Sequence, residues 1–213
     1  MNTTSTEERV YDAYTRISGM PISTGRTHLL MTFLPGKDTQ EAYQAALDFI
    51  AIDDKGEPRR DHHFLTFAGD TGCGKTHLAL GIGWQWLGLK LGVVKYWHVS
   101  ELLDAMRDEY DNPPKDDFDV VKPGVFEYCK RASLLILDDL GVEKTSDWVA
   151  DKLDTLINHR YIEEKPTVLT TNSESQNVLP RLRSRLKEGV VISIDAPDYR
   201  EVVAKKRKES KDD

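Results

Sequence analysis

The chain has 213 residues, of which 39% are hydrophobic and 31% charged, and its net charge at pH 7 is −7. This length suits one substantial α/β domain with a short appendage and excludes two full domains of ordinary size. The acidic balance argues against a whole-surface polyanion binder, so any contact with nucleic acid has to use a local basic patch.

Cysteine usage and hydropathy narrow the class further. Cys73 and Cys129 are too few and too oddly placed for a disulfide or zinc framework. The N-terminus lacks the apolar core of a signal peptide, and the most apolar stretch, residues 78–89, is too short to span a bilayer. We therefore expect a protein of the reducing cytoplasm with no membrane partner.

The first part of the chain predicts helices and a linker ahead of the main domain. Residues 7–17 favour a helix that Met20-Pro21 and the following Ser, Thr and Gly interrupt, and a second helix is expected over about 39–51. From these changes we divide the chain into three parts: a helical and linker region, with a possible partner-binding segment, at 1–55, the core domain at 56–196, and a basic C-terminal helix or tail at 197–213.

Within the core, apolar runs and helical patterns alternate. Strands are predicted over 64–68, 92–98, 133–138, 167–171 and 190–194, and helices over 75–89, 99–110, 146–162 and about 177–187. Such alternation is typical of a parallel sheet with helices on both faces.

Residues 69–76 read GDTGCGKT, a complete GxxxxGK[ST] phosphate-binding loop between a predicted strand and a predicted helix. The glycines let the backbone fold round phosphate oxygens, its N–H groups and the helix N-terminus face the negative charge, and the lysine reaches the β and γ phosphates. The final threonine is expected to hold Mg²⁺. We assign nucleotide contacts to Gly69, Asp70, Thr71, Gly72, Cys73, Gly74, Lys75, Thr76 and the adjacent His77.

Two later strands end in polar groups. The run 134–139 is apolar up to Asp138 and Asp139. In a chain with a phosphate loop, we expect Asp138 to act with Thr76 in holding the metal ion. We expect the Asp139 carboxylate to polarise the water that attacks the γ phosphate. Asn172 follows the strand 167–171 and is a candidate to orient that water; its alternative reading is a turn residue after a strand.

Two arginines lie four apart in the predicted helix near the end of the core. Arg181 and Arg185 share one face if this segment is helical. A guanidinium delivered to a neighbouring subunit's γ phosphate would make hydrolysis depend on assembly. Arg185 is the preferred candidate for this arginine, which is called an arginine finger, and Arg181 is expected to make a supporting contact. The alternative is that the segment is a solvated basic helix.

Taken together, these motifs resemble the AAA+ ATPases, most closely the bacterial helicase loaders of the DnaC and DnaI type and the related IstB transposition helpers. The resemblance covers about residues 64–195 and rests on GCGKTHLA at 72–79, DDLG at 138–141, LINHRY at 156–161 and the segment 165–172. It implies a five-stranded sheet in the order 5-1-4-3-2, ATP and Mg²⁺ as ligands, and a reduced or absent helical lid.

The resemblance also implies partners. A loader would bind a hexameric replicative helicase, assemble into an oligomer with Arg185 acting in trans, and touch single-stranded DNA through residues 96–107. Aromatic stacking by Tyr96 and Trp97 is one reading of that segment, and alternation across a buried strand is the other. A transposition helper would instead act on duplex DNA with a transposase. A phosphotransferase and an ATP sensor without turnover are the remaining alternatives.

Overall fold

The computed structural model of the chain describes residues 13–56, 58–59, 61–115, 122–141, 146–172 and 180–199, without the side chains of Pro180 and Arg181. The strands are β1 (Phe64–Gly69), β2 (Val94–His98), β3 (Leu134–Leu140), β4 (Thr167–Thr171) and β5 (Val190–Ile194). The described α-helices include α2 (Gln40–Phe49), α3 (Lys75–Gly88), α4 (Val99–Asp111), α5 (Val125–Arg131), α6 (Asp147–Ile162) and α7 (Pro180–Glu188).

All paired strands run parallel, in the order β2-β3-β4-β1-β5. This confirms the predicted order 5-1-4-3-2. β4 lies beside β1, so the end of the phosphate-loop strand and the end of β4 meet at one edge of the sheet, with the end of β3 next to them. Parallel sheets of this kind place ligands at the carboxyl ends of their strands.

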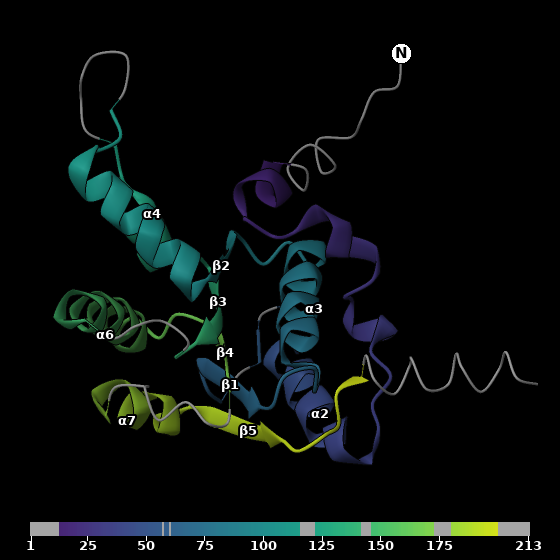
Figure 1. The fold of residues 1–213 in the computed structure, drawn as a ribbon. Helices are drawn as coiled ribbons and strands as arrows, with labels where there is room; N and C mark the ends of the chain where they lie inside the picture. Colours follow the sequence, from purple (N-terminus) through teal and green to yellow (C-terminus); the bar gives the residue numbers. More distant parts are fainter. Residues whose placement is uncertain are drawn as a thin grey trace, which may run out of the picture.

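Helices cover both faces of the sheet (Figure 1), and two apolar cores result. Alternate residues of β3 divide between them: Leu134 and Ile136 pack with α3 on one face, while Leu135 and Leu137 pack with α4 and α6 on the other. This period of two is what a strand buried on both faces requires. The continuous apolar run of β3 is therefore explained by burial on both sides.

The N-terminal segment belongs to the first of these cores. Its three short 3-10 helices are η1 (Ile22–Arg26), η2 (Leu30–Thr32) and η3 (Lys37–Thr39). Met20 and Leu30 are buried against α3. The Ser18 carbonyl accepts a 2.8 Å hydrogen bond from the Tyr96 backbone N–H, which covers the outer edge of β2. Figure 1 shows this segment running alongside α3 towards α2.

Predicted boundaries for 167–171 and 190–194 are confirmed, and the other core elements differ by a few residues at their ends. The sequence predicted no element between the helix over 99–110 and the strand over 133–138, and helix α5 lies in this interval; residues 116–121 of the same interval lie outside the described part. Residues 7–12, residues 177–179 and most of the predicted tail, 200–213, also lie outside it, as does any lid after β5. None of the helices in the described ranges has the length and apolar character needed to cross a membrane.

A buried arginine ties the second core together. Arg160 of α6 is 0% exposed. Its guanidinium donates to the carbonyls of Cys129, Ala132 and Pro166 at 2.8, 3.0 and 2.6 Å, and its Nε donates to the Thr167 hydroxyl at 2.9 Å. These bonds join α5, the start of β3 and the start of β4. Burial lowers the pKa of Arg160 to about 9, which leaves the group charged at neutral pH.

Candidate nucleotide-binding site

The predicted phosphate loop joins β1 to the N-terminus of α3, as the motif requires. Gly72 and Gly74 have φ angles of 82° and 104°, which side chains rarely adopt. A Cβ on Gly74 would lie 2.9 Å from the Phe33 ring, and a Cβ on Gly69 would lie 2.4 Å from the Ile194 carbonyl oxygen. The loop therefore needs glycine for its conformation and for its close neighbours.

Lys75 is buried beneath this loop, with 5% of its surface exposed. Its ammonium donates hydrogen bonds of 2.8 Å to the carbonyls of Gly69 and Asp70. The same ammonium lies 3.9 Å from Cys73 Sγ. Burial raises the pKa of the Cys73 thiol although the lysine opposes this shift. The charge of Lys75 is thus held inside the loop, where phosphate oxygens are expected to bind.

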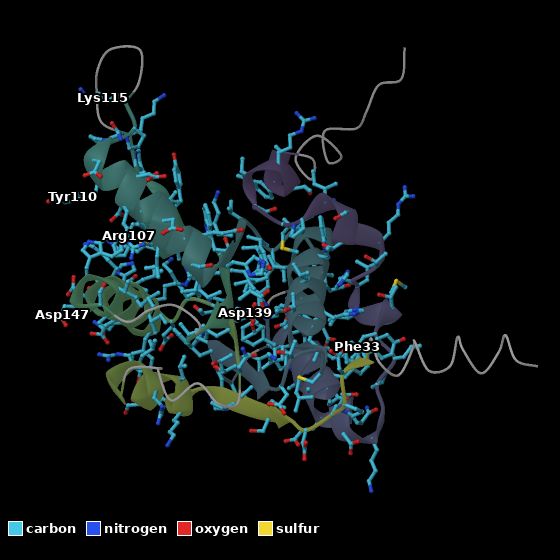
Figure 2. The ribbon with its side chains drawn as sticks, viewed as in Figure 1. Phe33, Arg107, Tyr110, Lys115, Asp139 and Asp147 are labelled. Carbon is cyan, nitrogen blue, oxygen red and sulfur yellow. The ribbon has the colours of Figure 1, made fainter. Side chains whose placement is uncertain are left out.

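A cavity of about 640 Å³ opens beside the loop and is lined from three parts of the chain. The phosphate loop and His77 form one wall, and Phe33 and the residues around it form another. The segment after β5 completes the cavity with Ala196, Pro197 and Tyr199. Its size and mixed lining fit a small-molecule ligand. Figure 2 shows Phe33 on the α3 side of the molecule, on the segment that precedes α2.

Aromatic rings gather at this cavity. The Phe33 ring meets the His77 ring edge-on at 5.2 Å between centroids, and it stacks on Tyr43 of α2 at 5.7 Å. Burial lowers the pKa of His77, whose Nε2 lies 3.1 Å from the Leu29 carbonyl. Phe33 is not predictable from the sequence, because Met31 to Leu34 carries no periodic pattern. These flat apolar groups suit a nucleotide base.

Asp138 is fully buried at the end of β3, where it accepts three hydrogen bonds. The hydroxyls of Thr76 and Thr170 donate to its Oδ1 at 3.1 and 2.5 Å. The Tyr96 hydroxyl donates to its Oδ2 at 2.8 Å. The predicted pair of Thr76 and Asp138 is therefore in contact, whereas Tyr96 and Thr170 are partners that the sequence analysis did not predict.

Asp139 follows in a β-bulge. Leu137 pairs with Leu169 and Leu140 pairs with Thr171. The interval is therefore three residues long in β3 and two residues long in β4, so β3 contains one extra residue here. Asp139 has φ 59°, and its N–H donates to the Thr170 hydroxyl at 2.9 Å. The side chain is 45% exposed. The bulge thus leaves a second carboxylate partly exposed to solvent beside the buried first one.

His98 at the end of β2 joins these acids. Its Nδ1 lies 3.6 Å from Asp138 Oδ2 and 4.0 Å from Asp139 Oδ2. The register predicts this meeting, because His98 pairs with Asp138 in the parallel ladder. The sequence places His98 and Asp138 at the ends of two strands, but their contact can be predicted only once β2 and β3 are known to be neighbours.

Asn172 and Arg185 come from elements other than those that hold this cluster. Asn172 directly follows β4, at the same sheet edge as the phosphate loop. Arg185 lies on α7, where it pairs with Asp154 at 3.4 Å and donates to the Asn158 side chain at 2.5 Å. Helix α7 packs against α6 on the sheet face opposite α3 (Figure 1). The side chain of Arg181 lies outside the described part.

The predicted DNA-contact segment divides in two. Tyr96 is buried, with 5% exposure, so its ring is not available to stack on a base. Further along α4, Arg107 is exposed and its guanidinium lies 5.1 Å from the centre of the Trp148 ring. The buried-strand reading therefore holds for Tyr96, and the outer part of α4 is the part open to a partner (Figure 2).

These residues fit a nucleotide with a divalent cation. The loop and Lys75 supply donors for phosphate, and the cavity beside Phe33 and His77 supplies apolar rings for a base. Thr76 and Asp138 supply hard oxygen ligands, the type that Mg²⁺ prefers.

Comparison with known proteins gives matching results. The family model "Bacterial DnaA ATPase domain" matches residues 24–193. The chromosomal replication initiator protein DnaA of Neisseria meningitidis is 28% identical over 171 residues, which cover 78% of this chain and 31% of that protein. The chain therefore spans about a third of the length of such curated relatives.

Two solved structures share the fold. A replication initiator DnaA bound to AMPPCP and single-stranded DNA has a TM-score of 0.66 at 22% identity, covering 86% of this chain and 55% of that one. A DnaC helicase loader has a TM-score of 0.61 at 24% identity, covering 80% of this chain and 98% of that one. The resemblance to the AAA+ replication ATPases is confirmed: this chain belongs to the family of bacterial DnaA ATPase domains.

Proposed function

We propose that this chain binds ATP with Mg²⁺ and hydrolyses it to ADP and phosphate. The carrying observation is the cluster at the strand ends, where Thr76 and Thr170 both donate to the buried Asp138 and Asp139 stands next to it. Lys75 and the loop N–H groups bind the phosphates, and Phe33 and His77 contact the base. A bound Mg²⁺ would neutralise charge on the phosphate oxygens.

The hydrolytic step needs a water aimed at the γ phosphorus. Asp139 accepts a proton from this water as its oxygen attacks, and Asn172 orients it. The bond that breaks joins the γ phosphorus to the oxygen that leaves with ADP. The half-exposed carboxylate of Asp139 and the position of Asn172 after β4 support these roles.

Two variants test this function. Lys75→Ala is expected to abolish ATP binding, measured by fluorescence titration with a labelled ATP analogue. Asp139→Asn is expected to retain binding and to lose phosphate release. Glu163→Gln, at an exposed residue just after α6, is the control and should match the wild type in both measurements. Equal turnover by the wild type and Asp139→Asn would remove Asp139 as the base.

At the level of the cell, we propose that the ATPase loads a replicative helicase onto single-stranded DNA. The family is that of a replication initiator, and the solved structures of similar fold include a helicase loader and a DnaA with single-stranded DNA. Both support a task in the initiation of DNA replication. The hexameric helicase would be the protein partner, and single-stranded DNA would be the nucleic acid on which it is placed.

A pull-down with the cognate hexameric helicase, with and without ATP, tests this proposal. We expect ATP-dependent association and transfer of the helicase to a single-stranded oligonucleotide. The second candidate is a transposition helper acting on duplex DNA with a transposase. ATP-dependent assembly on duplex in preference to single strands, with no helicase bound, would favour that candidate.

We further propose that neighbouring subunits complete each other's sites through Arg185. Its place on α7, on the sheet face opposite α3, suits delivery to another subunit. DNA and assembly should then stimulate turnover. Arg185→Ala and Lys75→Ala are each expected to be inactive alone and to regain part of the ATPase activity when mixed. In the mixture, the intact phosphate loop of an Arg185→Ala subunit can receive the intact Arg185 of a Lys75→Ala subunit. Arg183→Ala, on the same helix, is the matched control; failure of the mixture to recover activity contradicts a role in trans.

A further inference from the structure

His98 is a nitrogen ligand placed against both acids of β3. Its Nδ1 is 3.6 Å from Asp138 Oδ2 and 4.0 Å from Asp139 Oδ2, and the three ligand atoms lie within 4.8 Å of one another. Asp138 is fully buried, while His98 and Asp139 are 40% and 45% exposed. The cluster therefore has a fixed floor and an open side that solvent can reach.

The hydrogen bonds around Tyr96 assign the tautomer of the neutral His98 ring. The Tyr96 hydroxyl has one proton, which it donates to Asp138 Oδ2 at 2.8 Å. His98 Nε2 lies 3.2 Å from the same hydroxyl oxygen and has to be the donor there. Nδ1 then carries a lone pair, which faces the carboxylates.

Three lone-pair donors thus converge on one space. The gaps of 3.6 and 4.0 Å from Nδ1 to the carboxylate oxygens are too long for hydrogen bonds. All three ligand atoms lie within 4.8 Å of one another, which leaves room for a cation between them, since the ligands around a tetrahedral cation at roughly 2.1 Å are about 3.4 Å apart. Binding would draw the half-exposed Asp139 side chain closer to the other two ligands.

This space is distinct from the one beside Thr76. Asp138 Oδ1 faces the hydroxyls of Thr76 and Thr170, whereas its Oδ2 faces Tyr96 and His98. A cation held with the nucleotide at Thr76 uses the first side, so the second side is available to another ion. Imidazole nitrogen beside carboxylate oxygen favours first-row transition metals over Mg²⁺, which prefers oxygen alone.

We propose that His98 Nδ1, Asp138 Oδ2 and Asp139 Oδ2 form a second cation site that binds a divalent first-row transition metal such as Mn²⁺. Solvent completes the coordination on the open side. The site needs no nucleotide, because all three ligands belong to the protein and are held by β2 and β3.

Mn²⁺ titration without nucleotide, followed by electron paramagnetic resonance, tests this site. We expect the wild type to bind Mn²⁺ and its spin-echo spectrum to show modulation from a directly bound imidazole nitrogen. His98→Gln should lose that modulation and bind Mn²⁺ about tenfold or more weakly. His62→Gln, at another histidine in the loop before β1, is the matched control and should keep both. Excess Mg²⁺ should displace Mn²⁺ poorly from the wild type.

The wild-type spectrum decides even if His98→Gln does not fold, which circular dichroism would reveal. Absence of nitrogen modulation in the wild type overturns the site, as does modulation that persists in a folded His98→Gln. Because no nucleotide is present, either result is separate from failure of the ATPase. Lys75→Ala should keep the Mn²⁺ signal, which locates the ion away from the phosphate loop.

Discussion

The Thr170 hydroxyl donates to Asp138 Oδ1 at 2.5 Å and, at the same time, accepts the Asp139 backbone N–H at 2.9 Å. One side chain of β4 thus sets the position of both acids of β3. Thr170→Val keeps the shape and removes the hydroxyl, so the part-buried Asp139 N–H loses its acceptor and the buried Asp138 carboxylate loses one of its donors. We expect a loss of about 1–3 kcal/mol in the free energy of unfolding and slower turnover, measured by urea titration and phosphate release.

The same substitution at Thr66 is the control. The Thr66 hydroxyl is also buried in the sheet, but it has no hydrogen-bond partner in the described part of the chain. Thr66→Val should therefore leave stability unchanged or raise it. If the two variants lose equal stability, hydrogen bonding by Thr170 is not what holds the bulge.

Phe33 is predicted to bind the base and not the phosphates. Phe33→Ala removes the ring that meets His77 at 5.2 Å, and we expect ATP affinity to fall by about 1–3 kcal/mol, the range for stacking on a base. Binding of inorganic tripolyphosphate should be unchanged, as measured by competition against a labelled nucleotide. Phe126→Ala, on α5 in the other core, should alter neither; an equal loss for both ligands would argue against base stacking.

Arg160 is predicted to be the most costly single polar residue to remove from the second core. Arg160→Met leaves several buried carbonyls without a donor, and we expect a loss of about 3–5 kcal/mol in the free energy of unfolding. The exposed Arg107, paired with Asp104 at 2.7 Å, is the control. Arg107→Met should cost less than about 1 kcal/mol. Denaturant titration measures both, and comparable losses would contradict the role given to burial.

The two thiols are expected to react slowly with N-ethylmaleimide in the folded protein. Burial raises the pKa of Cys73, and it raises the pKa of Cys129 to about 12. The thiolate is the nucleophile, so a raised pKa leaves less of it at neutral pH. The reaction should accelerate with pH, roughly tenfold per pH unit while the pH stays below the pKa.

Mass spectrometry of the Cys129→Ala variant isolates the reaction of Cys73. Modification there adds bulk beside Lys75, so it should abolish nucleotide binding, and bound ATP should slow it. Cys73→Ala is the complementary control, in which only Cys129 remains and nucleotide has no effect. Protection of Cys129 by ATP would contradict the placement of the ligand.

Sequence patterns predicted the fold closely because its local signals agree with one another. The phosphate loop lies between a strand and a helix in the sequence and in the structure, and the apolar run ending at Asp138 is buried on both faces. The contact of Thr76 with Asp138 follows from the resemblance together with the strand order. These features depend on residues that are near in sequence or on a topology shared across a family.

Features that depend on distant packing were not predictable. Phe33 has no periodic pattern around it and becomes part of the site only because the N-terminal segment folds along α3. The sequence leaves two readings for Tyr96, stacking on a base or burial in the sheet. Its place in β2 beside β3 makes burial the correct one. The roles of Arg160 and Thr170 require the positions of carbonyls and N–H groups, which no spacing of residue types reveals.

The bulge in β3 carries one further consequence. The strand β3 keeps its register with β2 up to Asp138. Leu140 then packs in the same apolar core as Leu137. Asp139 is therefore an extra residue in an otherwise regular ladder. The pairing of β3 with its neighbours would continue in register without this residue. Asp139 is thus an insertion that the fold tolerates and does not require, and a chain lacking it would keep its strand phase while losing the second acid. In this protein the number of acids at the strand end, as well as their type, is open to change without rebuilding the sheet.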